Sequence, residues 1–348
     1  MSEIDPIYRE LAGKLDMEGS ELLQRILAKL ANLEQARIVR ELPTPLEEIA
    51  DKLNLDKETV ARHIQELIEK GLVVPTRKGP QMARTLIQLH DASLSDTKYD
   101  EALGDEFFDL WKELMGKEFF DESVEVIAGG EQPMWRIIPR WKAIKDVPGV
   151  LPFEDAREIL KSQEVLALVH CPCKREHRQR ECGIPDEVCL NVGRTAQYNI
   201  NRGAGKEITV ARALEVIEEC DQYPLIHMLP NQRAVNQLLC NCHWCCCGPL
   251  RPMVEQTKYP ITRGIAKSRF EAVVDPERCT GCEICLDWCQ FGAISMQASP
   301  ENGGELAFID PEKCMGCGCC VISCPSEACS MKLVRPPEHV PEGLGGIY

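Results

Sequence analysis

Apolar positions in the first ninety residues recur at the three- and four-residue spacing that is typical of amphipathic helices. Ser20 is placed to cap a helix that runs to about Leu42, and its apolar stripe comprises Leu22, Leu23, Ile26, Leu27, Leu30 and Leu33. The capping-box sequence Thr44-Pro45-Leu46-Glu47 predicts the start of a second helix. A third helix directs inward the residues Val60, Ile64, Leu67 and Ile68, and it ends at Gly71. Residues 72–74 then predict a strand, and residues 75–80 predict its turn.

This order of helices followed by a strand and a turn resembles the winged-helix family over residues 20–90. The resemblance implies that the third helix could read DNA through its outward positions, which are Lys57, Thr59, Arg62 and His63. Residues 1–80 contain twelve Lys and Arg against fifteen Asp and Glu, so the attraction to phosphate is weak. We therefore favour protein docking or dimerisation by this region over nucleic-acid binding.

The next part of the chain alternates between helical patterns and short apolar runs. Residues 91–150 contain an acidic helix whose aromatic and apolar face comprises Phe107, Phe108, Leu110, Trp111 and Leu114. A helix that begins near Pro152 is followed by the apolar run 165–169, which predicts a buried strand. Because that strand leads directly into Cys171 and Cys173, we expect a rigid element to position these two thiols.

Charge and missing motifs narrow the range of functions. The formal net charge is −15 with both signs interleaved, so no chain-wide field attracts nucleic acid or acidic lipid. The sequence contains no run of eighteen apolar residues and no secretory signal, so we expect a cytoplasmic protein without a membrane span. Residues 203–206 lack the spacing of a P-loop and no G-x-G-x-x-G follows a strand, so no ATP, flavin or nicotinamide site is indicated.

Cysteine is the most informative residue of the chain, which contains twenty of them. Their one- and two-residue spacings, in a long chain without an export signal, indicate thiolate ligands rather than disulfides. The strongest motif is C-x2-C-x2-C-x3-C, which occurs twice at a distance of thirty-five residues: Cys279, Cys282, Cys285 and Cys289, then Cys314, Cys317, Cys320 and Cys324. Three thiolates at this spacing can hold three irons of a cubane, and the fourth points to a second cluster. Gly281 and Gly316 let the backbone come close to sulfur.

This double motif resembles the bacterial two-cluster ferredoxin family over residues 270–335. The resemblance implies two 4Fe–4S clusters with crossed ligands, the first held by Cys279, Cys282, Cys285 and Cys324 and the second by Cys314, Cys317, Cys320 and Cys289. The sequence departs from the family at Gln290, where a proline is expected, and this change either loosens the turn or adds a polar contact. Two four-cysteine zinc sites are the alternative to the clusters. The remaining nearby thiols, together with one on the helix after Thr209, are expected to be small core residues: Cys220, Cys319 and Cys329.

A second group of thiols lies in the middle of the chain. The quartet Cys171, Cys173, Cys182 and Cys189 has loop-sized gaps and surrounds the basic segment 174–180. Basic side chains would offset the negative charge of an oxidised cluster with four thiolates, so we favour a third cluster over structural zinc, with inert or redox-sensing thiols as a further alternative.

The segment 240–250 places five cysteines within eight residues: Cys240, Cys242, Cys245, Cys246 and Cys247. Because all five cannot bind one cubane, they either hold most of a fourth cluster or join the Cys171 quartet in a shared centre. A reactive dithiol and plain packing are the alternatives. We favour His243 as a hydrogen-bond donor to sulfur, with a ligand role as the alternative, and we expect Trp244 to shield the site from water.

The pattern of residues 135–250 resembles a little-characterised family of iron–sulfur proteins from anaerobic microbes. We predict an α+β multidomain chain: a helical winged-helix-like region at 1–90, a helical linker at 91–134, a mixed α/β cysteine-rich domain at 135–268, a two-cluster ferredoxin domain at 269–335 and an extended tail at 336–348. Its predicted function is low-potential electron transfer to a redox protein partner, such as a flavoprotein or another oxidoreductase subunit. The alternatives are a reductase whose central cluster acts on a small substrate, and a redox-sensing transcriptional regulator. The sequence decides neither enzymatic activity nor oligomeric state.

Overall fold

The computed structural model describes residues 4–178, 183–235, 237–298 and 304–343. The contacts between residues divide the chain into two compact units. The first comprises Met1–Phe120, Val169–Glu187 and Tyr198–Lys206, and the second comprises Asp121–Leu168, Val188–Gln197 and Glu207–Tyr348. The mixture of helices and sheets in separate regions confirms the α+β multidomain fold class. The predicted domain boundaries are a finer division and stay a prediction.

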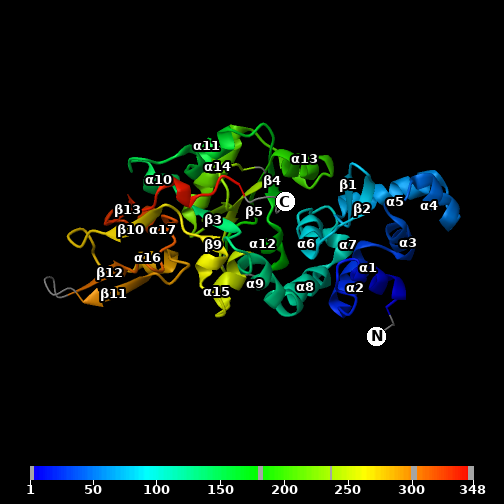
Figure 1. The fold of residues 1–348 in the computed structure, drawn as a ribbon, viewed down its shortest axis with the longest axis horizontal. Coiled ribbons are helices and arrows are strands. Elements are labelled where there is room, and N and C mark those ends of the chain that lie inside the picture. The colour runs from blue at the N-terminus through cyan, green and yellow to red at the C-terminus, as the bar shows by residue number, and fades with distance from the viewer. Residues whose placement is uncertain (1–3, 179–182, 236, 299–303, 344–348) are drawn as a thin grey trace. The chain divides into compact units, whose positions relative to one another are not determined.

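The first unit begins with short amphipathic helices around an apolar core (Figure 1). They are α1 (Pro6–Gly13), α2 (Glu21–Leu30), α3 (Leu33–Glu41), α4 (Leu46–Leu53) and α5 (Lys57–Glu69). Ser20 caps α2 as predicted, but the single helix that we predicted up to Leu42 is wrong. The chain becomes extended at Ala31 and starts α3 at Asn32, whose side chain accepts a hydrogen bond from the Gln35 amide. This second capping box separates the two helices.

The helix-turn-helix and its wing follow. The predicted second helix is α4, but the capping box proposed for it is wrong, because the N-cap is Pro45 and no side chain bonds there. The third helix is α5, capped by Asp56, and it buries Val60, Ile64 and Leu67 as predicted. Strands β1 (Val73–Thr76) and β2 (Gly79–Met82) pair antiparallel, so the turn is shorter than the predicted segment 75–80. Thr76 closes that turn, because its hydroxyl donates to the Gly79 carbonyl at 2.7 Å.

The rest of the first unit is mainly helical and includes a short strand. Its elements are α6 (Leu86–Leu94), α7 (Asp100–Leu103), α8 (Asp105–Glu113), the π-turn η1 (Leu114–Glu118), α12 (Pro172–Glu176) and β6 (Gly205–Glu207). The predicted aromatic face lies on α8, where Phe107, Phe108 and Trp111 are buried. The edge of the Trp111 ring meets the His90 imidazole, with the ring centroids 5.2 Å apart.

A mixed sheet forms the centre of the second unit. Its strands β5 (Glu187–Val192), β8 (Leu238–Cys242), β7 (Ile226–Pro230), β3 (Trp135–Ile138) and β9 (Ile265–Ala266) are neighbours in that order. Successive pairs are antiparallel except β3 and β9, which are parallel. Helices and helical turns surround the sheet: α9 (Phe120–Ala128), α10 (Trp141–Ile144), η2 (Pro152–Glu154), α11 (Ala156–Lys161), α13 (Gly193–Asn201), α14 (Val210–Glu219), η3 (Cys220–Gln222), α15 (Leu250–Glu255) and η4 (Ile261–Arg263). The predicted strand before Cys171 is β4 (Leu166–His170), and the helix predicted near Pro152 is divided into η2 and α11 because Asp155 caps α11.

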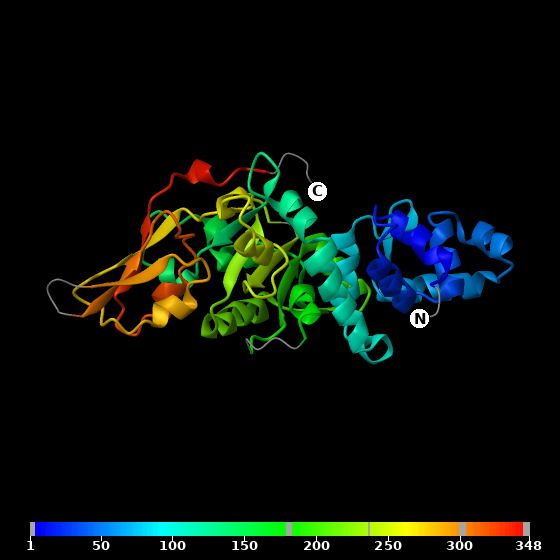
Figure 2. The same ribbon diagram turned by 90° about the horizontal axis from the view of Figure 1, so that it is seen from below.

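Two strand pairs and two short helices end this unit, and both views show them gathered together in orange to red (Figures 1 and 2). Strand β10 (Phe270–Val274) pairs antiparallel with β13 (Cys329–Leu333), and β11 (Ile294–Ala298) pairs antiparallel with β12 (Glu305–Ile309). The helices are α16 (Ile284–Trp288) and α17 (Cys319–Ile322). This symmetric arrangement places the two cysteine runs in equivalent positions.

The C-terminal tail continues with the turn η5 (Pro337–His339). The Arg233 guanidinium donates to the carbonyls of Pro337 and Val340, both at 3.1 Å, and so holds this segment against the second unit. Among the helices that the structure describes, none has the length and apolar character needed to cross a membrane.

Candidate metal centres

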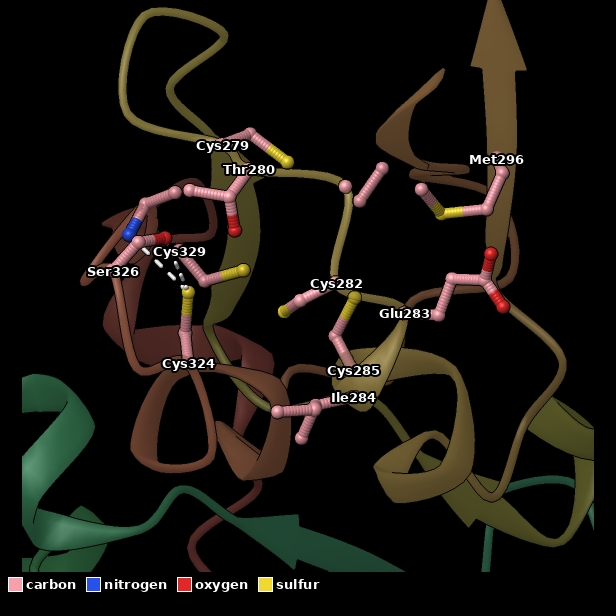
Figure 3. Close-up of a pocket in the computed structure, with 13 residues that line it drawn as sticks. Cys279, Thr280, Cys282, Glu283, Ile284, Cys285, Met296, Cys324, Ser326 and Cys329 are labelled. Carbon is pink, nitrogen blue, oxygen red and sulfur yellow. Dashed lines mark hydrogen bonds between the residues drawn. The ribbon is translucent and has the colours of Figure 1, made fainter. Parts of the chain in front are cut away.

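The first three cysteines of the first run and the last cysteine of the second run line one pocket. Cys279, Cys282, Cys285 and Cys324 all contribute to it, and Cys289 does not. Figure 3 shows the sulfurs of the first three directed into this space, with Cys324 and Cys329 opposite them. The structure thus gathers the four thiols that the crossed pattern assigns to one cluster, and their number and type fit a 4Fe–4S group. Their role as ligands stays a prediction.

Glycine is required at the third position of each run. Gly281 has φ +68°, and a Cβ atom there would lie 2.4 Å from the Glu305 carbonyl oxygen. Gly316 has φ +72°, and its Cβ would lie 2.2 Å from the Phe270 carbonyl oxygen. Both loops therefore press against a strand backbone, which is a different neighbour from the sulfur that we expected. A side chain at either position would displace the loop that carries the thiols.

Main-chain amides donate to the last sulfur of each run. The Ala293 amide lies 3.3 Å from the Cys289 sulfur, and the Ala328 amide lies 3.3 Å from the Cys324 sulfur. Burial raises the pKa of Cys289. Burial also opposes ionisation of Cys324, but hydrogen bonds from Ser326 and from main-chain amides outweigh it and lower the pKa of that thiol. Amide-to-sulfur bonds of this kind stabilise thiolates and tune iron–sulfur potentials.

The cysteines of the second run are more deeply buried than those of the first. Cys314 and Cys320 are buried, whereas Cys282 is exposed. Cys289 lies close enough to Cys314 and Cys319 that these thiols add to the rise in its pKa. Grouping of Cys314, Cys317, Cys320 and Cys289 around a second cluster stays a prediction.

Three further thiols were expected to be small core residues. Cys220 and Cys319 are each 1% exposed, and Cys329 is 6% exposed, which confirms their burial. Cys329 also lines the first pocket and makes a sulfur hydrogen bond with Cys285. Sequence reasoning missed that Cys329 lines the pocket, because its place there depends on the pairing of β13 with β10, a strand more than fifty residues earlier.

The segment that begins at Cys240 brings three of its five thiols together. Cys240 and Cys242 lie at the end of β8, and Cys247 returns across a turn to place its sulfur 3.0 Å from that of Cys242. Hydrogen bonds to Cys240 and Cys247, together with burial, raise the pKa of Cys242 well above its usual value. The described His, Cys, Asp and Glu residues form no group of three or more with the geometry for a single metal ion. Binding of a metal by these thiols would require them to lose protons.

The other two thiols of this segment have different neighbours. The His243 Nδ1 atom lies 2.9 Å from the Cys245 sulfur, which agrees with the predicted hydrogen bond to sulfur. The Cys246 sulfur lies 3.9 Å from the His243 carbonyl oxygen. Trp244 is 42% exposed, so a large part of its ring faces solvent and its predicted shielding role gains no support.

The quartet that begins at Cys171 remains a prediction, because Cys182 lies outside the described residues. Cys171 and Cys173 belong to the first unit, and Cys189 belongs to the second. The Asn191 side-chain amide donates to the Cys189 sulfur at 3.5 Å.

The basic residues beside this quartet have acidic partners. Arg175 pairs with Asp100 at 2.5 Å and Arg178 pairs with Asp105 at 2.8 Å, so their charges compensate these carboxylates within the first unit. The expected offset of cluster charge by Arg175 and Arg178 therefore finds no support in their contacts.

Comparison with protein families identifies two parts of the chain. Residues 264–328 match the family described as "4Fe-4S dicluster domain". The C-terminal module is a dicluster ferredoxin domain. Residues 43–74 match "Winged helix-turn-helix DNA-binding", so the N-terminal region contains a winged helix-turn-helix. No curated protein and no solved structure matches the chain. The dicluster domain supports 4Fe–4S clusters as cofactors and iron–sulfur electron transfer as the general chemistry.

Proposed function

We propose that the chain is an electron-transfer protein that passes low-potential electrons between the dicluster domain, a metal centre held by its central cysteines, and a redox protein partner. One observation carries this proposal. The dicluster domain retains all eight cysteines of its double motif, and four of them from two distant segments line one pocket. A bound 4Fe–4S cluster accepts and releases one electron, which is the chemistry that such a domain supplies.

The residues around the pocket support exchange with a partner. Cys282 is exposed, Cys279 and Cys324 are half-buried and Cys285 is buried, so the thiols at this end of the domain are only partly covered. Ile284, next to Cys285, is 39% exposed. A partly covered site with an exposed apolar neighbour allows close approach of a protein partner and limits the access of water.

Metal analysis after anaerobic purification tests the proposal. We expect at least about eight iron and about eight acid-labile sulfide atoms per chain, and a brown protein whose electron paramagnetic resonance spectrum changes on reduction with dithionite. Cys282→Ser is expected to lower the iron content, whereas Cys220→Ala, a buried thiol outside the motif, is the control that leaves it unchanged. Zinc in place of iron, or absence of sulfide, would contradict the proposal.

The winged helix-turn-helix favours one second candidate, a redox-sensing transcriptional regulator. Two outward residues of α5 already have acidic partners, since Lys57 pairs with Glu47 and His63 lies 2.8 Å from Glu34. DNA would have to displace these carboxylates, so we retain electron transfer as the main proposal. Tight binding to one DNA sequence at physiological salt, altered by cluster reduction, would favour the regulator; weak binding without sequence preference would oppose it.

A further inference from the structure

Gln290, which follows the last cysteine of the first run, bridges two distant segments. Its side-chain oxygen accepts a hydrogen bond from the Trp244 amide at 2.7 Å, and its side-chain nitrogen donates to the Pro224 carbonyl. Gln290 itself is 8% exposed, so it is largely shielded from solvent at this junction. The departure from proline thus adds polar contacts, which was one of the two outcomes expected from the sequence. Proline at this position would leave the Trp244 amide and the Pro224 carbonyl without these partners.

Apolar packing surrounds this bridge. Met315 and Cys319 of the dicluster domain belong to the same buried cluster as Cys242 and Cys247 of the central segment. Trp288 and Phe291, on either side of Cys289, pack against that cluster. The Cys289 end of the domain is therefore in continuous contact with the segment that carries the central thiols.

Two polar contacts join the second run to other neighbouring segments of the same unit. The Cys319 sulfur donates to the Leu225 carbonyl at 3.4 Å, next to the carbonyl that Gln290 uses. The Arg140 amide donates to the Cys317 carbonyl at 2.9 Å. A Cβ atom on Gly318 would lie 2.7 Å from the Ala143 side chain, which shows how closely the loop approaches α10.

The opposite end of the domain has a different environment. Pro325 occupies the position equivalent to Gln290, and Cys282 at this end is exposed. The two ends of this nearly symmetric domain therefore differ in one residue, Gln290 at one end and Pro325 at the other. They also differ in how far neighbouring segments cover them.

We propose that Gln290 is a positioning residue that fixes the Cys289 end of the dicluster domain against the segment 240–247, and so makes this end the site of internal electron exchange. The inference rests on the proposed function. With a cluster bound in the dicluster domain and a metal centre bound at the central thiols, each exchange would move one electron from the first to the second, and no bond would form or break. Short, well-packed contact between the two segments favours such exchange over release of the electron to solvent-borne acceptors.

Hydrogen exchange of the Trp244 amide tests the positioning directly in the full chain. Gln290→Ala and Gln290→Pro are expected to accelerate it about tenfold, because a hydrogen bond of about 1.4 kcal/mol is lost. Pro325→Ala, the equivalent change at the other end, is expected to leave it unchanged. An unchanged Trp244 exchange rate in both Gln290 variants would overturn the proposal.

The kinetics of reduction test whether Gln290 affects internal electron exchange. Dithionite is mixed with the anaerobic protein, and freeze-quenched resonance spectra follow the dicluster and central signals separately. We expect Gln290→Pro to slow the appearance of the central signal at least about tenfold while the dicluster signals keep their rate, and Pro325→Ala to slow neither. Equal central rates in the Gln290 variants and the parent protein would refute the inference alone, whereas a parent protein without iron in the dicluster domain would refute the proposed function as well.

Discussion

At the scale of single residues, backbone freedom and buried charge decide whether the ligand loops form. Gly281 and Gly316 each have a left-handed backbone conformation, and each lies against a carbonyl oxygen of a neighbouring strand. An added methyl group there meets backbone, which cannot rotate away as a side chain can. The cysteines supply the chemistry, but these two glycines allow them to converge.

Gly281→Ala is expected to release iron from the domain and to lower its thermal stability, because the new Cβ would lie 2.4 Å from the Glu305 carbonyl oxygen. The matched control is Gly292→Ala, where φ is +59° and no atom lies within 4 Å. The control substitution is expected to lower the free energy of unfolding by only about 1 kcal/mol, because alanine is disfavoured in the left-handed conformation but meets no other atom there. Iron content and the visible absorbance during heating measure the difference, and equal behaviour of the two variants would disprove the steric argument.

Arg269 and Glu154 form a buried ion pair at 2.7 Å, with each side chain 3% exposed. Arg269→Leu is expected to destabilise the second unit by about 3–5 kcal/mol, because the Glu154 carboxylate would remain buried without its partner. The exposed pair of Arg278 and Glu327 is the control, and Arg278→Leu should cost less than about 1 kcal/mol. Urea denaturation of the two variants gives this comparison, and a similar midpoint for both would contradict it.

At the scale of elements, caps and ion pairs determine where helices end and which helices stay together. Asn32 starts a new helix where the apolar stripe alone predicted continuity. In the same unit, His90 of α6 bonds to Glu176 of α12 at 2.8 Å, although eighty-six residues separate them. This buried pair links the segment after Cys173 to the helical region.

The pair of His90 and Glu176 predicts a pH-dependent stability. Burial alone would lower the pKa of His90, but hydrogen bonds to Asp91 and Glu176 outweigh it and raise the pKa to about 10. The unfolded imidazole titrates near pH 6.5, so the charged folded state gains stability that is fully present below about pH 6.5. This contribution falls as the pH rises toward about 10, by up to about 1.4 kcal/mol per pH unit.

Hydrogen exchange of α6 and α12, corrected for the intrinsic effect of pH, measures this change between pH 6 and 10. His90→Gln is expected to remove the pH dependence. His63→Gln, which alters a partly exposed pair with Glu34, should retain it. A parent protein whose corrected protection of α6 does not change over this range would contradict the assignment.

At the scale of the whole molecule, we expect the thiols of the dicluster domain and those of the central segment to set the total metal content together. The central thiols Cys240, Cys242 and Cys247 converge in the second unit, which also contains the dicluster domain. The net charge of −15 gives the chain no general attraction for nucleic acid, and this agrees with the proposed protein partner.

The combined substitution of Cys240, Cys242 and Cys247 by serine is expected to lower the iron content to about eight atoms per chain, the number that two 4Fe–4S clusters require. The parent protein should exceed that value. Cys220→Ala is the control in which a buried thiol is removed outside the proposed ligand sets. Iron and sulfide analysis checks the outcome, and a parent protein with about eight iron atoms would show that the central thiols hold no cluster.

Local patterns predicted much of the structure. The stripe of α5, the buried strand before Cys171 and the aromatic face of α8 follow from spacing within one element, and each was confirmed. Prediction failed where two short-range signals competed. The apolar stripe that runs across Asn32 suggested one helix, but the Asn32 side chain caps a new helix and so divides the segment into two.

The sequence by itself determined the chemical class, because the spacing of cysteines in a short loop limits which groups they can hold. Tertiary structure decided which distant residues meet. It brought Cys324 beside three cysteines of the first run, placed Cys240 and Cys247 against Cys242, and gave Gln290 a partner forty-six residues away. Such contacts depend on how sheets and loops pack, and no local periodicity encodes them.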